Sequence, residues 1–335
     1  MLKINQIEYY LPKNHIQNKD LLKLNPGWDL EFLTKKTGVL NRFYTGKDET
    51  ALDIANKACE AFFEKNESVK SKIDGLIFCT QSNDYIMPPN SSLLHGMLNL
   101  SEQVLAFDFN LACSGYIYGL ALANGLIETK VATNILMINA DTYSKYINDS
   151  DRSSKLLFGD AAAVTHLHRS YDGKGLIDII CATSGVNYRK FIIPAGGMRK
   201  PKSNETKIIS KDKSGNVRNQ EQIHMDGLGI FSFVNTKVPK QVMEILKRNQ
   251  FKIEDIDLFV FHQASKLALE SLTKILKIDP DKVFINIDKV GNTVSASIPI
   301  ALKDAQQEKK IKNGDKVLCA GFGVGLSWGT CIFQF

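Results

Sequence analysis

The strongest constraint on the fold of this chain is a sequence pattern that occurs twice. Residues Lys72–Ser82 read KIDGLIFCTQS and residues Asp255–Ser265 read DIDLFVFHQAS. In each copy an Ile-Asp pair leads into a short apolar run that ends at a polar cluster. Two short similarities could arise by chance, but two further strand-like runs follow each copy in the same order. This shared order favours a duplicated unit.

Both copies lie within an alternation of strand-like and helical patterns. Short apolar runs predict strands at Gly75–Cys79, Val104–Phe109, Asn134–Ala140, Leu258–Phe261, Val283–Ile287 and Lys316–Ala320. Apolar residues at helical spacing predict helices at Thr50–Lys65, Ser114–Glu128, Val238–Asn249, Lys266–Lys277 and Ser295–Glu308. Alternation of this kind is typical of α/β proteins with largely buried sheets.

Polar residues at the ends of the predicted strands are the candidates for a functional site. Cys113 follows the second strand of the first copy and begins a helix, and Asn292 follows the corresponding strand of the second copy. When the copies are aligned, Cys79 takes the place of His262, and Cys113 roughly that of Asn292. A pseudo-twofold arrangement of the halves would therefore bring Cys113, His262 and Asn292 together at the centre.

The position of Cys113 is compatible with two roles. A free cysteine is most often a small buried hydrophobe. At the start of a helix, however, unpaired N–H groups and the helix dipole stabilise a thiolate and can receive an oxyanion. Position alone does not decide between them. The other cysteines lie within helical or strand runs, and we expect them in the core: Cys59, Cys79, Cys181, Cys319 and Cys331.

His262 and Asn292 each have a structural and a functional interpretation. A histidine at the end of a strand can be structural, or it can be a general base or hydrogen-bond donor at the sheet edge where α/β sites form. Asn292 alone would be read as a turn or helix-cap residue. The glycine-rich run Gly321–Gly325 is not followed by a helical pattern, which argues against a dinucleotide site. Glycines let the backbone approach another group closely, so a backbone N–H directed at an active site is the better interpretation of this run.

Composition limits the remaining possibilities. The formal net charge of +6 on 335 residues is compatible with an acidic or phosphorylated partner, and equally with a plain solvated surface. Residues 1–15 hold no apolar run long enough for a signal peptide, and no run approaches 18 apolar residues. The cysteines form no C-x-x-C pair and have no histidines at metal-ligand spacing. We expect a cytoplasmic protein without membrane insertion, nucleic-acid partner or structural metal.

The hydrophilic segment Gly196–Gln222 is expected to be an excursion or mobile loop.

Taken together, these motifs resemble those of β-ketoacyl-acyl-carrier-protein synthase III, a family of thiolase-fold condensing enzymes. The matching segments are ACSG at Cys113, DRSSKLLFGDAAAV, HQAS at His262, GNTVSASIP at Asn292 and GFGVGLSWG near the end. The resemblance spans nearly the whole chain. It implies a thiolase fold, with duplicated αβαβα halves in residues 1–170 and 171–335 and a five-layered α-β-α-β-α core.

The resemblance also implies a mechanism. Cys113 would attack an acyl-CoA, and the backbone N–H groups of Cys113 and Val324 would form the oxyanion hole. His262 and Asn292 would donate hydrogen bonds to the enolate formed when a malonyl thioester, on carrier protein or CoA, loses carbon dioxide. The product would be a β-ketoacyl thioester, and no metal or redox cofactor is implied.

Binding residues are carried over from the family in the same way. Phe32, Lys36, Arg152 and Ser265 would lie along the CoA site, and Met87 would close the acyl pocket of the partner subunit in a homodimer. The family usually has tryptophan, arginine and asparagine where this chain has Phe32, Lys36 and Ser265. These differences indicate a specialised relative rather than the initiator of ordinary fatty-acid synthesis.

The remaining expectations concern partners and alternative functions. Lys266, Lys274 and Lys277 are candidates for contacting an acidic carrier protein, although a solvated helix face would explain them as well. One alternative is an acyltransferase that moves the acyl group from Cys113 to a hydroxyl or amine, with His262 as general base and no release of carbon dioxide. Another is a catalytically silent partner in a heteromer, against which the intact trio of cysteine, histidine and asparagine argues.

Overall fold

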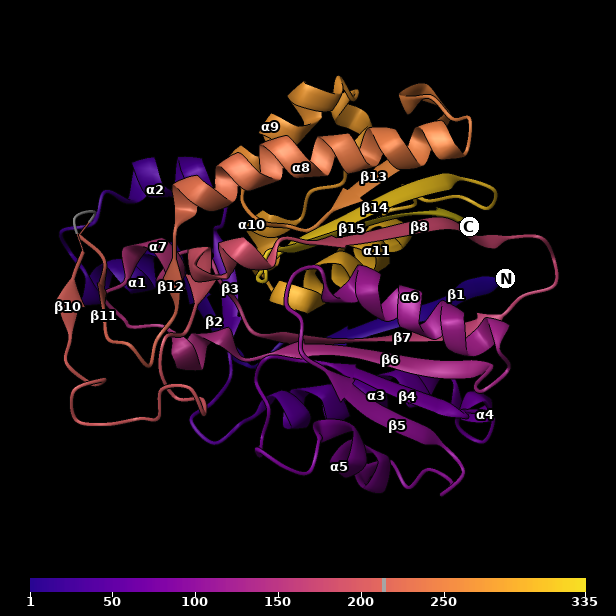
Figure 1. Cartoon of the computed structure of the whole chain (residues 1–335), viewed down its shortest axis with the longest axis horizontal. Coiled ribbons are helices and arrows are strands. Elements are labelled where there is room, and N and C mark those ends of the chain that lie inside the picture. Colours follow the sequence, from indigo (N-terminus) through magenta and orange to yellow (C-terminus); the bar gives the residue numbers. More distant parts are fainter. Residues whose placement is uncertain (213–214) are drawn as a thin grey trace.

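Two β-sheets alternate with three layers of helices (Figure 1). The computed structural model describes residues 1–212 and 215–335. Two helices cover the outer face of each sheet and two lie between the sheets. The first sheet is covered by α3 (Ala51–Lys65) and α5 (Asn90–Met97), and the second by α8 (Gly227–Arg248) and α9 (Lys266–Leu276). The central pair is α6 (Gly115–Glu128) and α11 (Ser297–Gln307). This arrangement confirms the five-layered core expected from the sequence.

The first sheet has five strands in the order β1-β7-β6-β4-β5. They are β1 (Leu2–Tyr10), β4 (Gly75–Cys79), β5 (Leu105–Phe109), β6 (Asn134–Asp141) and β7 (Ala161–Arg169). Strand β4 pairs in parallel with β5 and β6, whereas β7 runs antiparallel to β6 and β1. Every residue of β4 is buried, as expected for a central strand that is covered on both faces.

The second sheet repeats this order. Its strands, in the order β13-β14-β15-β8, are β13 (Leu258–Phe261), β14 (Lys316–Gly323), β15 (Ser327–Gln334) and β8 (Gly175–Thr183). A single parallel bridge joins Phe259 to Val283, where the first sheet has β5. The repeated strand order confirms the duplication. The division into domains at residues 170 and 171 stays a prediction, although the chain passes from one sheet to the other between β7 and β8.

One predicted strand is wrong. Residues Val283–Ile287 form only the bridge at Val283, and α10 (Ile287–Val290) begins where the strand was expected to end. The short apolar run suggested a strand, but the backbone here bonds to a side chain. The N–H of Asn286 donates to Oε1 of Gln263 at 3.1 Å. This bond takes the donor that would have extended a ladder.

Helix α8 begins eleven residues earlier than its predicted start at Val238. Glycine and proline disfavour helix interiors, so Gly227, Gly229 and Pro239 hid its first half in the sequence. Asp226 caps this end by accepting the N–H of Gly229 at 2.9 Å. The other predicted helices agree with α3, α6, α9 and α11 to within two residues.

The remaining elements are short and lie outside the two main sheets. They are β2 (Asn14–Gln17), α1 (Asn18–Leu24), α2 (Leu30–Thr37), β3 (Asn41–Tyr44), α4 (Glu67–Lys70), α7 (Arg152–Lys155), β9 (Phe191–Ile192), β10 (Ser210–Lys211), β11 (Val217–Arg218), β12 (His224–Met225) and five 3-10 turns. No helix of the described ranges is both long and apolar enough to cross a membrane.

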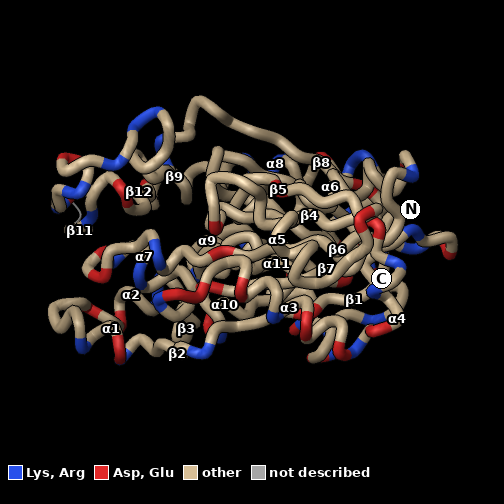
Figure 2. The backbone as a smooth tube through the Cα atoms, turned by 90° about the horizontal axis from the view of Figure 1, so that it is seen from below, with Lys and Arg blue, Asp and Glu red and all other residues tan. Residues whose placement is uncertain are grey.

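The hydrophilic segment at residues 196–222 is an excursion, as expected. Its described part forms the β10–β11 hairpin, at the end of the molecule opposite the two chain termini (Figures 1 and 2). Arg218 in this hairpin is buried and contacts the carboxylates of Asp151 at 3.5 Å and Asp212 at 2.7 Å. The hairpin is thereby joined to α7, because Asp151 caps that helix.

The largest apolar cluster fills the space between the two sheets. Helix α6 contributes Ile117 and Leu120 to it, and α11 contributes Ile298 and Leu302; all four are fully buried. Charged residues lie mainly along the outer loops and helices (Figure 2). Because both sheets pack against α6, the two halves share one apolar core.

This packing gives a stability prediction. Leu120→Ala should lower the free energy of unfolding by about 2–5 kcal/mol, because the side chain is fully buried between the sheets. Leu122→Ala on the same helix is the matched control, since Leu122 is 41% exposed, and it should cost less than about 1 kcal/mol. Chemical denaturation measures both. Equal losses would contradict this account of the core.

Candidate active site

Cys113 lies in the short connection between β5 and α6, directly before the cap residue Ser114. Its side chain is 3% exposed. The end of β14 approaches it closely: a Cβ atom added to Gly323 would lie 2.8 Å from Cβ of Cys113. Only glycine fits there, so the backbone of the β14–β15 turn reaches the cysteine directly. This is the role that the sequence suggested for the glycine-rich run.

Burial dominates the electrostatics of Cys113. Burial raises the pKa of the thiol well above its ordinary value, and the nearby carboxyl of Asp141 raises it further. Desolvation thus acts against a thiolate, in the opposite sense to the helix N-terminus, and favours the neutral thiol.

Asp141 is a buried carboxyl that sequence reasoning missed. It ends β6, is 1% exposed and accepts the N–H of Gln81 and the O–H of Ser295, each at 2.8 Å. Burial raises the pKa of this carboxyl to about 7 despite these hydrogen bonds. A buried acid at the end of a strand is hard to recognise from sequence, because the run NILMINAD predicts a strand and says little about its depth.

His262 extends the ladder of the second sheet by one residue. Its N–H donates to the carbonyl of Ala320 at 2.8 Å, and the ring is 1% exposed. Burial lowers the pKa of the imidazole to about 3, so the ring is neutral at physiological pH. The ring Nδ1 lies 2.6 Å from Oγ of Ser297, the first residue of α11. Ser297 was also missed, although it lies in the quoted GNTVSAS segment.

Asn292 is held in one orientation by backbone hydrogen bonds. Its Oδ1 accepts the N–H of Val294 at 3.0 Å, so Nδ2 faces Nε2 of His262 at 3.4 Å. Its own N–H donates to the carbonyl of Leu157 at 2.9 Å. Gly291, with a φ of 73°, makes the turn before it. The asparagine is thus a fixed donor and not merely a turn residue.

The bond to Ser297 determines what His262 can do. When the serine O–H donates to Nδ1, the ring proton lies on Nε2. Nε2–H and the Nδ2–H₂ group of Asn292 are then neighbouring donors, and a separation of 3.4 Å leaves both able to bind a ligand oxygen.

One cavity of about 340 Å³, which opens to the surface at Leu228 and Leu267, brings Cys113, His262 and Asn292 together. Its walls are mostly apolar, with Leu157 and Phe322 among them. The predicted convergence of the two halves on a common centre therefore agrees with the structure. The catalytic role of each residue stays a prediction.

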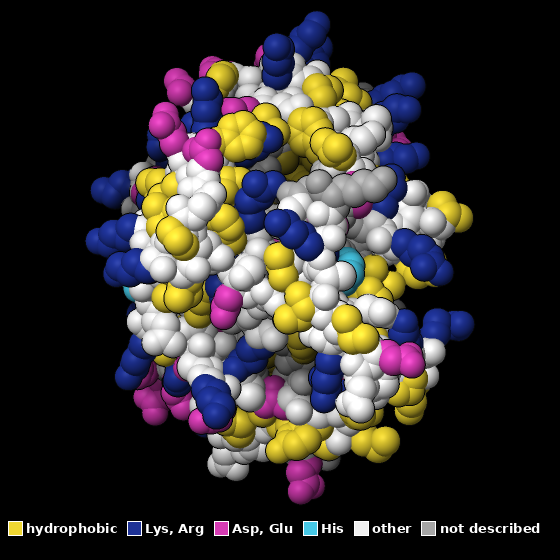
Figure 3. All heavy atoms as spheres, turned by 90° about the vertical axis from the view of Figure 1, so that its left-hand side faces the viewer, with side chains coloured by type: hydrophobic (Ala, Val, Ile, Leu, Met, Phe, Trp, Pro, Cys, Tyr) yellow, Lys and Arg dark blue, Asp and Glu magenta, His cyan; other side chains and the backbone are white. Residues whose placement is uncertain are grey.

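Two of the residues expected at the CoA site, Lys36 and Ser265, also line this cavity. Ser265 caps α9, and its Oγ accepts the N–H of Ala268 at 3.2 Å. Phe32, on α2, is 52% exposed and lies beneath Lys36, whose Nζ is 4.1 Å from the ring centroid. Arg152 is exposed on α7 and lies outside the lining of the cavity. Figure 3 views the end at which α2 lies and shows lysine and arginine side chains spread over it.

Most of the other predicted residues lie apart from the three central ones, whereas Val324 packs against the apolar cluster that contains Cys113. Met87 is 79% exposed on the loop before α5. Val324, beside Gly323, lines a second cavity next to the first. The three lysines associated with α9 are exposed, and Lys266 pairs with Glu270 at 3.7 Å.

A duplicated αβαβα core with polar side chains from both halves meeting in a central cavity defines a thiolase-fold enzyme. Comparison with known proteins narrows the class. Residues 107–185 match the family described as 3-oxoacyl-(acyl-carrier-protein) synthase III, and residues 246–335 match its C-terminal region. The chain belongs to the 3-oxoacyl-(acyl-carrier-protein) synthase III family.

Individual relatives cover the whole chain. The β-ketoacyl-acyl-carrier-protein synthase III of Caldanaerobacter subterraneus subsp. tengcongensis is 35% identical over 326 residues, which are 97% of this chain and 95% of that protein. The protein of the same name from Campylobacter curvus is 35% identical and covers 100% of this chain and 98% of its own. A crystal structure of a 3-oxoacyl-(acyl-carrier-protein) synthase III superposes with a TM-score of 0.97 at 36% identity, covering 100% of this chain and 99% of its own.

The pKa of Asp141 predicts a pH-dependent stability. Because its folded-state pKa is raised from 3.8 to about 7, the unfolded chain loses this proton first as the pH rises, and the folded state loses stability across that window. Asp141→Asn lacks the titrating carboxyl and should not show this loss of stability. The unfolding free energy of Asp141→Asn minus that of wild type should therefore rise by on the order of 2–3 kcal/mol between pH 5 and pH 7 and then level off.

Chemical denaturation at several pH values measures this difference. Asp48→Asn, at an exposed carboxylate, controls for the change in net charge. A difference between Asp141→Asn and wild type that stays constant over the window would contradict the raised pKa.

Proposed function

We propose that this protein catalyses the decarboxylating condensation of an acyl-CoA with a malonyl thioester, giving a β-ketoacyl thioester. The observation that carries the proposal is the cavity shared by Cys113, His262 and Asn292 in a chain of this family. The names of its relatives refer to an acyl carrier protein, which is the natural carrier for the malonyl group.

Acylation is the first step. The sulfur of Cys113 attacks the thioester carbonyl, the acyl–sulfur bond of the CoA thioester breaks, and the thiol proton ends on the leaving CoA sulfur. The backbone N–H groups of Cys113 and Val324 would hold the developing oxyanion. Neither group makes a hydrogen bond to another residue within residues 1–212 and 215–335, which supports this role.

Decarboxylation follows on the acyl-enzyme. As the malonyl thioester loses carbon dioxide, its thioester oxygen gains negative charge, which Nε2–H of His262 and Nδ2–H of Asn292 would stabilise. The carbanion attacks the acyl-cysteine and releases the Cys113 thiolate, which takes up a proton. Neutral donors suit this step, because a carboxylate there would repel the enolate, and the low pKa of His262 keeps its ring neutral. We propose that no metal or redox cofactor takes part.

Transfer to a hydroxyl or amine is less favoured. That reaction needs His262 to accept a proton as a general base. A ring with a pKa of about 3 is a weak base near neutral pH. Its bond to Ser297 and its proximity to Asn292 suit a positioned donor better.

The mostly apolar cavity is the proposed channel for the CoA arm, with Lys36 and Ser265 in its wall and Phe32 close by. Arg152 would contact the distal part of CoA. The differences from the family at Phe32, Lys36 and Ser265 still favour a specialised relative. A cytoplasmic location is part of the same proposal.

A homodimer completes the proposal. Strand β5 is the edge of the first sheet and has only β4 beside it, so one row of its backbone groups is open for pairing. The nearby loop exposes three large side chains, Tyr85, Ile86 and Met87, which are 59%, 94% and 79% exposed. Exposed apolar side chains beside an open edge support a subunit interface here, through which Met87 would reach the partner's acyl pocket.

The proposed function is tested by following the two steps separately. Intact mass should show that an acyl-CoA adds its acyl group to the wild-type protein and not to Cys113→Ala. His262→Ala and Asn292→Ala should still be acylated, but should release carbon dioxide from a malonyl thioester about 10²–10³-fold more slowly than wild type. An acylated wild-type enzyme that transfers its acyl group to a hydroxyl or amine without releasing carbon dioxide would refute the condensation.

Carrier recognition gives a separate prediction. Lys266→Glu, Lys274→Glu and Lys277→Glu, combined, should raise KM for malonyl-acyl-carrier protein about tenfold, because the exposed lysines would meet an acidic carrier. KM for malonyl-CoA should stay near the wild-type value. Lys309→Glu and Lys310→Glu, both exposed and away from α9, provide the control. Equal effects on both malonyl substrates would rule out a carrier-docking role.

A further inference from the structure

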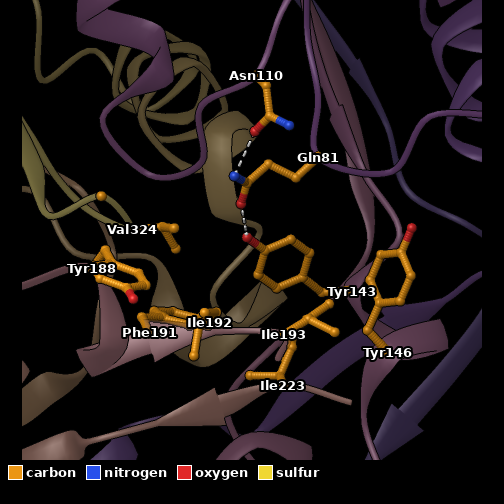
Figure 4. Close-up of a pocket in the computed structure, with 11 residues that line it drawn as sticks. Gln81, Asn110, Tyr143, Tyr146, Tyr188, Phe191, Ile192, Ile193, Ile223 and Val324 are labelled. Carbon is orange, nitrogen blue, oxygen red and sulfur yellow. Dashed lines mark hydrogen bonds between the residues drawn. The ribbon is translucent and has the colours of Figure 1, made fainter. Parts of the chain in front are cut away.

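A second cavity of about 340 Å³ lies next to the first, which contains Cys113 (Figure 4). Phe191 lines both cavities. The end of β14 and the turn after it also lie between them, with Gly323 lining the first cavity and Val324 the second. The two cavities are therefore separated at Phe191 by a single side chain.

The wall around Phe191 is aromatic. Phe158 lines the first cavity and packs against Phe191, with 6.0 Å between the ring centroids. Tyr143 lines the second cavity and packs against Phe191 from that side, with 6.3 Å between the centroids. Tyr143 and Phe158 also contact each other, at a centroid distance of 5.3 Å. The three rings are at most 7% exposed and belong to one apolar cluster with Cys113. They close the direct path between the cavities.

Each ring is carried by a different segment of the chain. Phe191 belongs to β9, which pairs with β12 and places Phe191 opposite Met225. Phe158 forms a parallel bridge with Asn292, and Tyr143 begins the 3-10 turn that follows β6. Rings that are packed against one another and anchored in this way resist displacement, because a close-packed interior does not readily accept extra methylene groups.

An acyl chain on Cys113 meets this wall. In the proposed function, the first cavity holds the CoA arm while the thioester is attacked. A short acyl group needs little more than the space around the sulfur, but a longer chain has to extend elsewhere. The second cavity has an apolar side that suits an alkyl chain. That side consists of Phe191, Ile192, Ile193, Ile223 and Val324. The three rings stand between the sulfur and this surface.

We infer that Phe191 determines the length of the acyl chain that this enzyme accepts. Its ring, supported by Tyr143 and Phe158, closes the first cavity towards the second and restricts the donor to short acyl groups. The inference rests on the proposed function and specifies its acyl substrate. Since Phe191 is the one described residue that lines both cavities, a smaller side chain at this position would connect them.

The test compares acyl-CoAs that differ only in chain length. The protein is incubated with acetyl-, butanoyl-, hexanoyl- or octanoyl-CoA at one concentration, and the rate of Cys113 acylation is followed by intact mass. Octanoyl-CoA should acylate the wild-type protein about tenfold more slowly than acetyl-CoA, because its extra methylene groups have no room in front of the rings. Phe191→Ala should raise the rate with octanoyl-CoA about tenfold. Acylation by acetyl-CoA should persist in this variant, which shows that it is folded.

Three further variants test whether the rings act through their size. Tyr143→Ala removes the ring on the far side of Phe191 and should also speed acylation by octanoyl-CoA. Tyr143→Phe keeps the ring and should keep the wild-type preference for acetyl-CoA. Phe63→Ala, at a partly buried phenylalanine of α3 outside the described lining of both cavities, is the matched control. It loses the same side chain and should leave the preference unchanged.

The outcomes separate the inference from the proposed function. If octanoyl-CoA acylates wild type as fast as acetyl-CoA, or if Phe191→Ala keeps the wild-type preference, the inference is wrong and the condensation is unaffected. An equal change of preference in Phe63→Ala also overturns it. If no acyl-CoA labels Cys113 of the wild-type protein, the proposed function fails, and the role of Phe191 fails with it.

Discussion

The close approach of helix α6 to both sheets determines where Cys113 lies. A Cβ atom added to Gly115 would lie 2.3 Å from Sγ of Cys79, and one added to Gly321 would lie 2.8 Å from the carbonyl oxygen of Cys113. Neither contact leaves room for a side chain. The start of α6 therefore packs directly against a strand of each half. Cys113 is therefore placed by close contacts with both sheets, through the side chain of Cys79 in the first and the backbone of Gly321 in the second.

The burial of Cys113 and His262 determines the charges of these two groups. It raises the pKa of the Cys113 thiol and lowers that of the His262 imidazole to about 3, so both groups are neutral at rest. Charge would then develop only during reaction, next to donors that are already positioned by Ser297 and Val294. A site of this kind needs little reorganisation when an oxyanion forms.

The sequence predicted the features that depend on local order along the chain. The repeated motif predicted the duplicated sheets, and the polar strand ends predicted that Cys113, His262 and Asn292 would converge. Features that depend on depth or on distant partners were not predictable. The raised pKa of the Cys113 thiol results from burial among residues of both halves, and the missing strand at residues 283–287 results from a bond to the side chain of Gln263. The hydrogen bonds from Tyr143 to Gln81 and from Gln81 to Asn110 also join residues that lie far apart in sequence.

The unequal ends of the two sheets have a consequence for assembly. A duplicated fold could present two equivalent open edges, and each molecule could then join two others in an endless chain. Here the second sheet has no strand equivalent to β5 among the described residues, and a single bridge between Phe259 and Val283 stands in its place. The broken internal symmetry thus leaves the edge at β5 without an equivalent in the other half. In the proposed homodimer, a contact of that edge with its own copy would be self-complementary and would close on itself, giving a finite pair rather than a fibre.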